Sequence, residues 1–407
     1  MHPPSPCFQF PKIKFVGIST EDANSPYRLV QKGPEEAKNL RRRLEKYCGI
    51  VDQNASSDGI SFRWEPHMRE SYEVANVIFH EIARANRSLL HQALFSFPSM
   101  SNPDDLDKLA AVLQTEKCRH LLGLEEAHAE LYPTSPAPYM CIKFSTCVPT
   151  SDDDNCDPAT LTDSASSATK SWVNNFLGKY RLCPYTSSVS HAAVGLPSVG
   201  VPVGGVHVRV STSESTDTGE TKRSYNIQRA SGLVHAFWSE VVTLMHSPQE
   251  EWATSLVVFP EFDSDFESFV DVCDKILEPA ITATQSTTKI GRAWFHPRYD
   301  ADSVGHSDVI AGHAVPNEMV EGFIKSSLHP PDGKDNQVLL EYDEVIQANN
   351  RVRQTPHATI NILRRSQLIA AAEYEKGLGD KKPKANSIYV RNTIRLSEVI
   401  KRTANML

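Results

Sequence analysis

The segment from Ile290 to Phe295 has the pattern of a β-strand, and that strand must end at His296-Pro297. Proline has no backbone N–H and cannot continue a central β-ladder. The imidazole of His296 is therefore expected at the carboxyl end of a strand, with Tyr299 in the loop just beyond. In open α/β sheets this edge is where ligands usually bind. The alternative is a polar turn in which the histidine is hydrogen-bonded to its surroundings.

Strands and helices alternate through the second half of the chain, which predicts an α/β fold: a layered sheet with helices packed on it. Strand patterns cover residues 201–210, 255–259 and 290–295. Helical patterns cover residues 170–179, 225–245, 262–276, 360–375 and 386–402. The run 255–259 is continuously apolar, as expected of a buried strand.

The first part of the chain has a different pattern. Residues 1–147 are predicted to be a mostly helical region of unknown role, with helices over 35–47 and 68–95 and another that begins near Asn102. Residues 139–147 have the pattern of a strand. The polar stretch 148–169 has few large apolar residues and is predicted to be a linker to an α/β domain over 170–407. We see no internal repeat in the sequence.

The composition limits the classes of function. The 407 residues carry a formal charge of −8, which argues against a general nucleic-acid partner. No apolar run approaches the roughly 20 residues of a membrane span, so no membrane partner is expected. The N-terminus lacks a secretory pattern, and the eight cysteines form no C-x-x-C pair. These features predict an intracellular, cytoplasmic protein, while organelle targeting and the oligomeric state are left open.

Four ordered motifs resemble a known family. They are Trp172 to Leu177 with Leu182-Cys-Pro-Tyr185; Thr254 to Pro260 with Asp265-Phe266; Phe295-His-Pro-Arg-Tyr299; and Thr355-Pro356 with Ile362-Leu-Arg364. Together they are similar to the domain of unknown function family 1415, over roughly residues 170–396. Val390-Arg391-Asn392 resembles the Glu-Arg-Asn near the end of that family.

This sequence departs from the family pattern at three positions. Asn361 stands where the family has a histidine, Arg365 stands where it has an acid, and Arg298 stands where it has an aspartate. The family has no established activity, so the resemblance implies candidate positions and no reaction.

Three residues are candidates for catalysis: His296, Cys183 and Tyr299. A histidine at a strand end suits acid–base chemistry or contact with an anion. Cys183 follows the C-terminal end of a predicted helix, where the helix dipole opposes the thiolate that a reactive cysteine needs. Its alternative role is a small buried side chain that fixes a turn before Pro184.

Three further residues are candidates for ligand binding: Arg364, Arg391 and Asp265. Arginine forks match carboxylate and phosphate groups, and the first two lie in family-like segments. Asp265 lies between a strand end and a helix start, where capping the helix is the alternative role. We expect Arg364, His296 and Tyr299 to converge near Cys183 around a small anionic ligand.

No metal or cofactor is assigned. His296 with His306, His313 and the nearby aspartates has no standard metal-ligand spacing. No glycine-rich phosphate loop occurs, so the cofactor is unknown. Two functions stay open. One is a small-molecule enzyme, or the relic of one, that acts on an anionic metabolite at the carboxyl edge of the sheet. The other is a non-catalytic binding or protein-interaction module whose motifs are structural.

Overall fold

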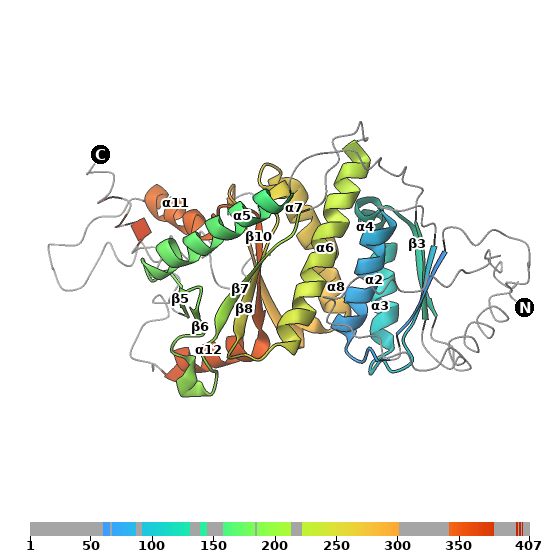
Figure 1. Ribbon diagram of the computed structural model, residues 1–407, viewed down its shortest axis with the longest axis horizontal. Coiled ribbons are helices and arrows are strands. Elements are labelled where there is room, and N and C mark those ends of the chain that lie inside the picture. The colour runs from blue at the N-terminus through green and yellow to red at the C-terminus, as the bar shows by residue number, and fades with distance from the viewer. Residues whose placement is uncertain are drawn as a thin grey trace, which may run out of the picture. The chain divides into compact units, whose positions relative to one another are not determined.

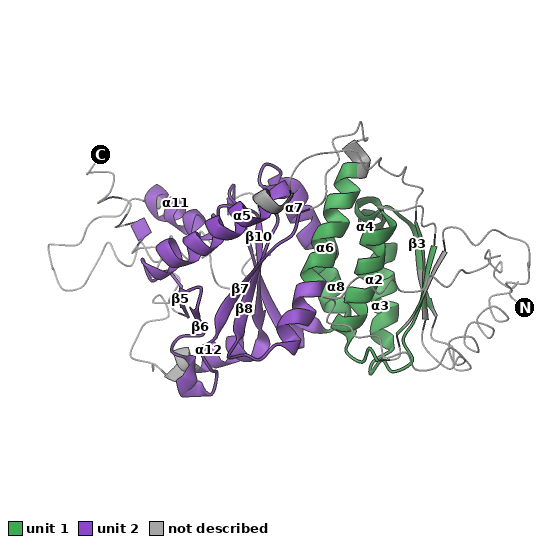
Figure 2. Ribbon diagram, in the orientation of Figure 1, with its two compact units in different colours: residues 1–154, 215–238, 275–285 green, residues 155–214, 239–274, 286–407 purple. Residues whose placement is uncertain are grey.

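The computed structural model in Figure 1 describes residues 60–65, 67–86, 92–130, 139–144, 158–183, 185–212, 222–300 and 342–377, with residues 396, 397, 399 and 401. The chain forms two compact units, coloured in Figure 2. Unit 1 comprises residues 1–154, 215–238 and 275–285, and unit 2 comprises residues 155–214, 239–274 and 286–407. The domain boundaries expected from composition, at 147 and 170, stay a prediction.

Unit 1 contains a four-stranded sheet in the order β1-β2-β4-β3. The strands β1 and β2 are parallel, and β4 is antiparallel to both of its neighbours. The strands are β1 (Ile60–Trp64), β2 (Gln92–Ser96), β3 (Leu124–Glu130) and β4 (Tyr139–Phe144). The helices are α2 (Ser71–Ala85), α3 (Asp104–Gln114), α4 (Glu116–Leu122), α8 (Glu278–Ala283) and the first part of α6 (Lys222–His246).

The N-terminal region was predicted to be mostly helical, but its described part also contains a four-stranded sheet. The predicted helix 68–95 is wrong at its C-terminal end, since α2 stops at Ala85 and Gln92–Ser96 is the strand β2. Every residue of β2 is buried, so its apolar positions do not alternate. A short, fully buried strand cannot be told from a buried helix by periodicity alone.

Unit 2 contains a second four-stranded sheet, in the order β7-β8-β10-β9. Its strands are β7 (Gly205–Val210), β8 (Trp252–Val258), β9 (Ile290–Phe295) and β10 (Thr359–Arg364), with a small hairpin of β5 (Thr186–Ser188) and β6 (His191–Ala192). Its helical elements include α5 (Pro158–Trp172), the π-helix η1 (Val173–Gly178), α7 (Phe266–Val272), α11 (Tyr342–Arg353) and α12 (Arg365–Gly377). Short 3-10 turns are η2 (Leu196–Val199), η3 (Pro260–Phe262) and η5 (Ser286–Thr288), and a second π-helix is η4 (Cys273–Leu277).

The α/β class expected for the second half of the chain is confirmed, with two corrections. Residues 158–169, expected to be linker, form the first part of α5. Residues 360–364, expected to begin a helix, lie in the strand β10 between β8 and β9, and the helix α12 begins only at Arg365. Helix and strand are hard to separate here because three of the four residues from Ile360 to Leu363 are apolar and no turn signal stands before the helix.

The two sheets have the same connectivity. In both, the first two strands are parallel and joined through a helix, while the fourth strand is inserted antiparallel between the second and the third. In both, the second strand is followed by Phe-Pro, at Phe97-Pro98 and Phe259-Pro260. The chain thus contains a repeated topology that the sequence did not reveal.

The hydrogen bond that closes the first strand pair is also the same in the two units. Glu65 N–H donates to the Ser96 carbonyl over 2.9 Å, and Ser211 N–H donates to the Val258 carbonyl over 2.9 Å. Because Ser96 and Val258 each precede the Phe-Pro step directly, this bond sets the register that equates residues of the two sheets.

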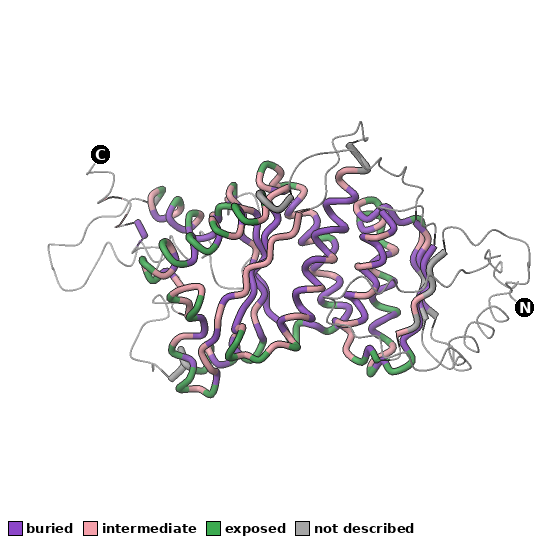
Figure 3. The backbone as a smooth tube through the Cα atoms, viewed as in Figure 1, coloured by how far each residue is buried: buried purple, intermediate pink, exposed green. Residues whose placement is uncertain are grey.

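One hydrophobic core cluster of unit 2 lies on the face of the sheet that points toward α5, α11 and α12. It contains Trp172, Leu256, Phe295, Ala348 and Val352, among others. Trp172 meets Phe295 edge-on, with ring centroids 5.7 Å apart. Figure 3 shows buried positions following the strands and the inner sides of the helices. The other face carries Ser255, Val257 and Arg364, since side chains alternate along a strand.

Candidate functional site

The strands β7, β8 and β9 run in the same direction, and β10 runs against them. Their carboxyl ends therefore share one edge of the sheet with the amino end of β10. His296 and Tyr299 follow β9 at this carboxyl edge, as the sequence predicted. Asp263, after β8, and His357, before β10, lie at the same edge.

His296 is buried and uses both ring nitrogens. Its Nδ1 accepts the backbone N–H of Arg298 over 3.0 Å, and its Nε2 lies 2.9 Å from the carbonyl oxygen of Phe262. This pattern requires a neutral ring with the proton on Nε2. Burial lowers the pKa of His296, against the opposing effects of the Phe262 carbonyl and Asp263. These contacts give His296 a structural role in joining the loop after β9 to the turn after β8. Its catalytic role stays a prediction.

Tyr299 is buried beside a second fully buried residue, Arg353 of α11. The Arg353 guanidinium lies 5.0 Å from the centre of the Tyr299 ring, and its Nη1 donates to the tyrosine hydroxyl over 3.4 Å. The backbone N–H of His296 donates to the Arg353 carbonyl over 3.2 Å. Tyr299 and Arg353 therefore attach the loop after β9 to α11.

A small cavity lies against His296 and Tyr299. Its other walls are apolar side chains of α7 and β9, among them Phe266, Phe269 and Trp294. The cavity volume is about 10 Å³, which is near the lower limit for one water molecule. A metabolite does not fit in this space without movement of the side chains.

The carboxyl edge also holds an Asp–His pair that sequence reasoning did not single out. His357 Nδ1 lies 2.7 Å from Asp263 Oδ2, and the Ala358 N–H donates to Asp263 Oδ1 over 2.8 Å. The side chains are 20% and 31% exposed. No other side-chain contact of His357 occurs among the described residues, which leaves Nε2 without a partner there. Only the pairing of β8 with β10 brings these residues together, so no local signal could have found the pair.

Arg298 adds a positive charge at this edge. It is exposed, and its Nη1 donates to the Ser264 carbonyl over 2.9 Å. Ser264 directly follows Asp263 in the chain. Asp265 is also close in sequence, but its carboxylate caps α7 by accepting the Ser268 N–H over 3.2 Å. The capping alternative explains Asp265, and its role in ligand binding stays a prediction.

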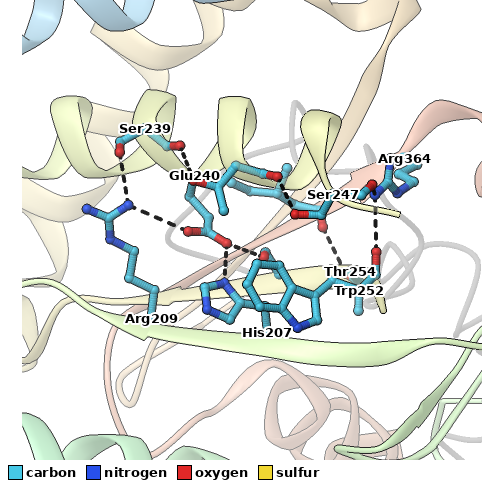
Figure 4. A network of polar contacts seen from close by, with 11 residues as sticks. His207, Arg209, Ser239, Glu240, Ser247, Trp252, Thr254 and Arg364 are labelled. Atoms are coloured by element: carbon cyan, nitrogen blue, oxygen red, sulfur yellow. Dashed lines mark hydrogen bonds and ion pairs between the residues drawn. The ribbon is translucent and has the colours of Figure 1, made fainter. Parts of the chain in front are cut away.

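The structure does not bring Arg364 to His296. Arg364 pairs with Ile290, the first residue of β9, whereas His296 follows the last. Five residue steps along a strand separate the two ends, about 17 Å. Arg364 Nη2 instead donates to the carbonyls of Ser247, over 2.6 Å, and Trp252, over 3.3 Å (Figure 4). The expected convergence of Arg364 with His296 and Tyr299 is therefore wrong.

Cys183 lies in the turn between η1 and β5. Burial raises the pKa of its thiol, and hydrogen bonds from Thr186 and Tyr185 oppose this only in part. A thiol with a raised pKa is mostly protonated at neutral pH and is a poor nucleophile. The geometry agrees with the alternative of a turn-fixing side chain.

Two other expectations fall largely outside the described residues. Arg391 lies outside them, as do His306 and His313 of the metal hypothesis. Within the described part of the chain, no three His, Cys, Asp or Glu side chains come together as metal ligands would. In the same part, no helix is both long enough and apolar enough to cross a membrane.

A second polar cluster lies on the α6-facing side of β7 and β8, and the sequence analysis missed it entirely. Glu240 of α6 is fully buried, and its Oε1 accepts from His207 Nδ1 over 2.5 Å and from the Ser255 hydroxyl. Arg209 lies 3.6 Å from Glu240 Oε2 (Figure 4). The signal that could have found it is period-two alternation, which places His207 and Arg209 on one face of a strand.

The fold and these contacts define a mixed α/β domain with a polar carboxyl edge. Residues 164–311 match the model of a family described as a protein of unknown function, DUF1415. This confirms the resemblance over most of the predicted span, while Arg364 and Arg391 lie beyond the match. No curated protein and no solved structure matched the chain.

Proposed function

We propose that unit 2 acts on a small anionic molecule at the carboxyl edge of its sheet, with His357 as the acid–base group. The observation that carries this proposal is the 2.7 Å contact between His357 Nδ1 and Asp263 Oδ2. A carboxylate that accepts the Nδ1 proton of a histidine fixes the ring and leaves Nε2 to exchange a proton with a ligand.

Three contacts support this assignment. The second oxygen of Asp263 is held by the Ala358 N–H, so the carboxylate cannot rotate freely. The His357 side chain is 20% exposed, so the ring is in part open to solvent. Arg298 is anchored one residue beyond Asp263 and offers its other N–H groups to a carboxylate or phosphate.

The sequence-predicted residues His296 and Tyr299 have a supporting role in this proposal. Their contacts join the turn after β8, the loop after β9 and α11. Asp263 lies in the turn after β8, and His357 follows α11 in the chain. A site held by such buried contacts keeps its geometry when a ligand binds.

The test is a thermal-shift screen of carboxylated and phosphorylated metabolites, followed by NMR detection of product for each compound that binds. We expect a compound whose turnover His357→Gln abolishes and Asp263→Asn reduces, with both variants folded. His246→Gln, a change at the end of α6, is the matched control and should keep full turnover. A compound that is turned over equally by His357→Gln would contradict the proposal.

The alternative is a non-catalytic binding or interaction module. The observation that favours it is that His296, Asp265 and Cys183 all have structural partners. In that case no compound in the screen is turned over, and His357→Gln differs from the natural chain only in stability.

A further inference from the structure

The edge strand β7 presents His207 and Arg209 on the face that meets Glu240. His207 Nδ1 contacts Glu240 Oε1 over 2.5 Å, and Arg209 Nη1 lies 3.6 Å from Oε2. The His207 ring and the Arg209 guanidinium thus both lie against the Glu240 carboxylate, as Figure 4 shows. The Glu240 side chain is 0% exposed, while those of His207 and Arg209 are 26% and 35% exposed.

The equivalent arginine of unit 1 is bound differently. Arg63 pairs with Phe95, two residues before Phe97-Pro98, as Arg209 pairs with Val257, two residues before Phe259-Pro260. Arg63 donates through Nε, over 3.1 Å, and Nη2, over 3.0 Å, to the buried carboxylate of Glu81. The repeated topology therefore contains an edge arginine beside a buried helix glutamate in both units.

In unit 2, two further side chains contact the glutamate. His207 and its strand partner Ser255 occupy Glu240 Oε1, at the register positions that hold Ser61 and Ala93 in unit 1. Because unit 1 builds the same strand pair with those smaller residues, the sheet itself does not require a histidine there. Arg209 therefore lacks the pair of hydrogen bonds to Glu240 that Arg63 makes to Glu81.

The donors left over belong to the two partly exposed side chains of the cluster. Arg209 uses Nη1 to bond the Ser239 hydroxyl over 2.9 Å, and its Nη2 and Nε have no partner among the described residues. His207 Nε2 also has none within that part of the chain. The His207 ring stacks on Trp252 with centroids 3.9 Å apart, which fixes its orientation. Glu240 Oε2 is buried and makes no hydrogen bond to any described residue.

We propose that His207 and Arg209 form a binding site for a phosphoryl oxyanion. The arginine fork supplies paired N–H donors, which match the oxygens of a phosphate. His207 supplies a third donor, its Nε2–H, in the ring form that carries a proton on both nitrogens, because Glu240 holds Nδ1–H. Ser239 and Trp252 hold the two heads in place before the anion arrives, so less ordering entropy is lost on binding. His207 and Arg209 lie on the edge strand β7, which β8 separates from β10, and they make no contact with the Asp263–His357 pair, so this site does not depend on His357.

The experiment measures the thermal midpoint of the full chain against inorganic phosphate, with sodium chloride at matched ionic strength as the reference. Matched ionic strength removes the difference in screening, but phosphate also stabilises folded proteins in general by exclusion from their surface. The effect of the site is therefore the part of the rise in midpoint that saturates with phosphate concentration, as mass action requires. We expect phosphate to raise the midpoint above the chloride reference, and Arg209→Gln to weaken the apparent affinity at least tenfold. Arg351→Gln, a change of an exposed arginine on α11, is the matched control and should leave it unchanged.

His207→Gln should also weaken phosphate binding, and circular dichroism will show whether that variant folds. Arg209 is partly exposed, so Arg209→Gln gives a folded test even if the histidine variant does not. A phosphate effect equal to that of chloride, or a saturating effect that survives in Arg209→Gln, would overturn the proposal. Because His357→Gln should keep phosphate binding, failure here is distinguishable from failure of the acid–base site.

Discussion

His296 and Arg364 lie at opposite ends of the same pair of strands. His296 follows Phe295, which pairs with Thr359, whereas Arg364 ends β10 opposite Ile290. The antiparallel pairing separates two residues that the motif order alone suggested would meet. One consequence is that Arg364 lies at the other end of the sheet from the Asp263–His357 pair, so the two can be tested separately.

Removing the His296 side chain should destabilise unit 2. His296→Ala removes two hydrogen bonds, one to the Phe262 carbonyl, which keeps the Asp265 N–H, and one from the Arg298 N–H. Two lost hydrogen bonds, at about 0.5–1.5 kcal/mol each, cost about 1–3 kcal/mol. Urea denaturation should show a loss of at least this size, whereas a loss below that of a surface change such as Glu267→Ala would show that the two bonds are not formed.

The same histidine should make stability depend on pH. Burial lowers the pKa of His296 in the folded protein, so the unfolded chain binds more protons as the pH falls below about 6.5. The contribution of His296 is complete above the unfolded pKa and is lost as the pH falls through the folded pKa. The free energy of unfolding should therefore fall between pH 7 and pH 5, and less steeply in His296→Gln than in the natural chain.

Glu65 in unit 1 should have the opposite effect. Burial raises its pKa to about 6, helped by Glu81 and opposed by Arg63. The folded state therefore holds the proton more tightly, and the stabilising contribution of protonated Glu65 is lost as the pH rises from 4.5 through 6. Glu65→Gln should flatten this part of the stability profile and be more stable than the natural chain at pH 7. A variant that is less stable at pH 7 would contradict the buried environment of the carboxyl group.

Phe269 tests the packing of α7 directly. It is 1% exposed, and Val257 of β8 is 0% exposed, as the sequence predicted. Phe269→Ala should lower the free energy of unfolding by about 3–5 kcal/mol. Glu267→Ala, on the exposed side of the same helix, is the control and should have a small effect. Equal effects of the two changes would mean that α7 presents another face to the sheet.

Gly178 tests the close approach of η1 to β5. A Cβ atom at this position would collide with the backbone carbonyl oxygen of Ser187, and backbone cannot rotate away as a side chain can. Gly178→Ala should cost on the order of 1–3 kcal/mol. Gly232→Ala is the control, because its Cβ would meet nothing within 4 Å on a helix. That change should stabilise by about 0.5–1 kcal/mol, since glycine is a poor helix former.

Local patterns in the sequence were sufficient for the elements whose ends carry strong signals. The strand Ile290–Phe295 was predicted at its exact bounds because Pro297 cannot continue a ladder. The helix that became α6 was predicted within three residues at its start and one at its end, because its apolar positions recur at helical spacing over many turns. The sequence motifs also predicted the family resemblance, and the family model confirms it over residues 170–311.

Strand pairing determined the rest, and pairing is a property of residues far apart in the chain. No local pattern says that Thr359–Arg364 inserts between β8 and β9, so Arg364 was assigned to a helix and to the wrong edge of the sheet. The contacts of His357 with Asp263, and of His207 with Glu240, arise only when separate elements pack together. The sequence therefore determined where several helices and strands begin and end, and which polar side chains lie at those ends. The tertiary structure alone decided which of them meet, because a contact depends on register and direction between strands that the chain order leaves open.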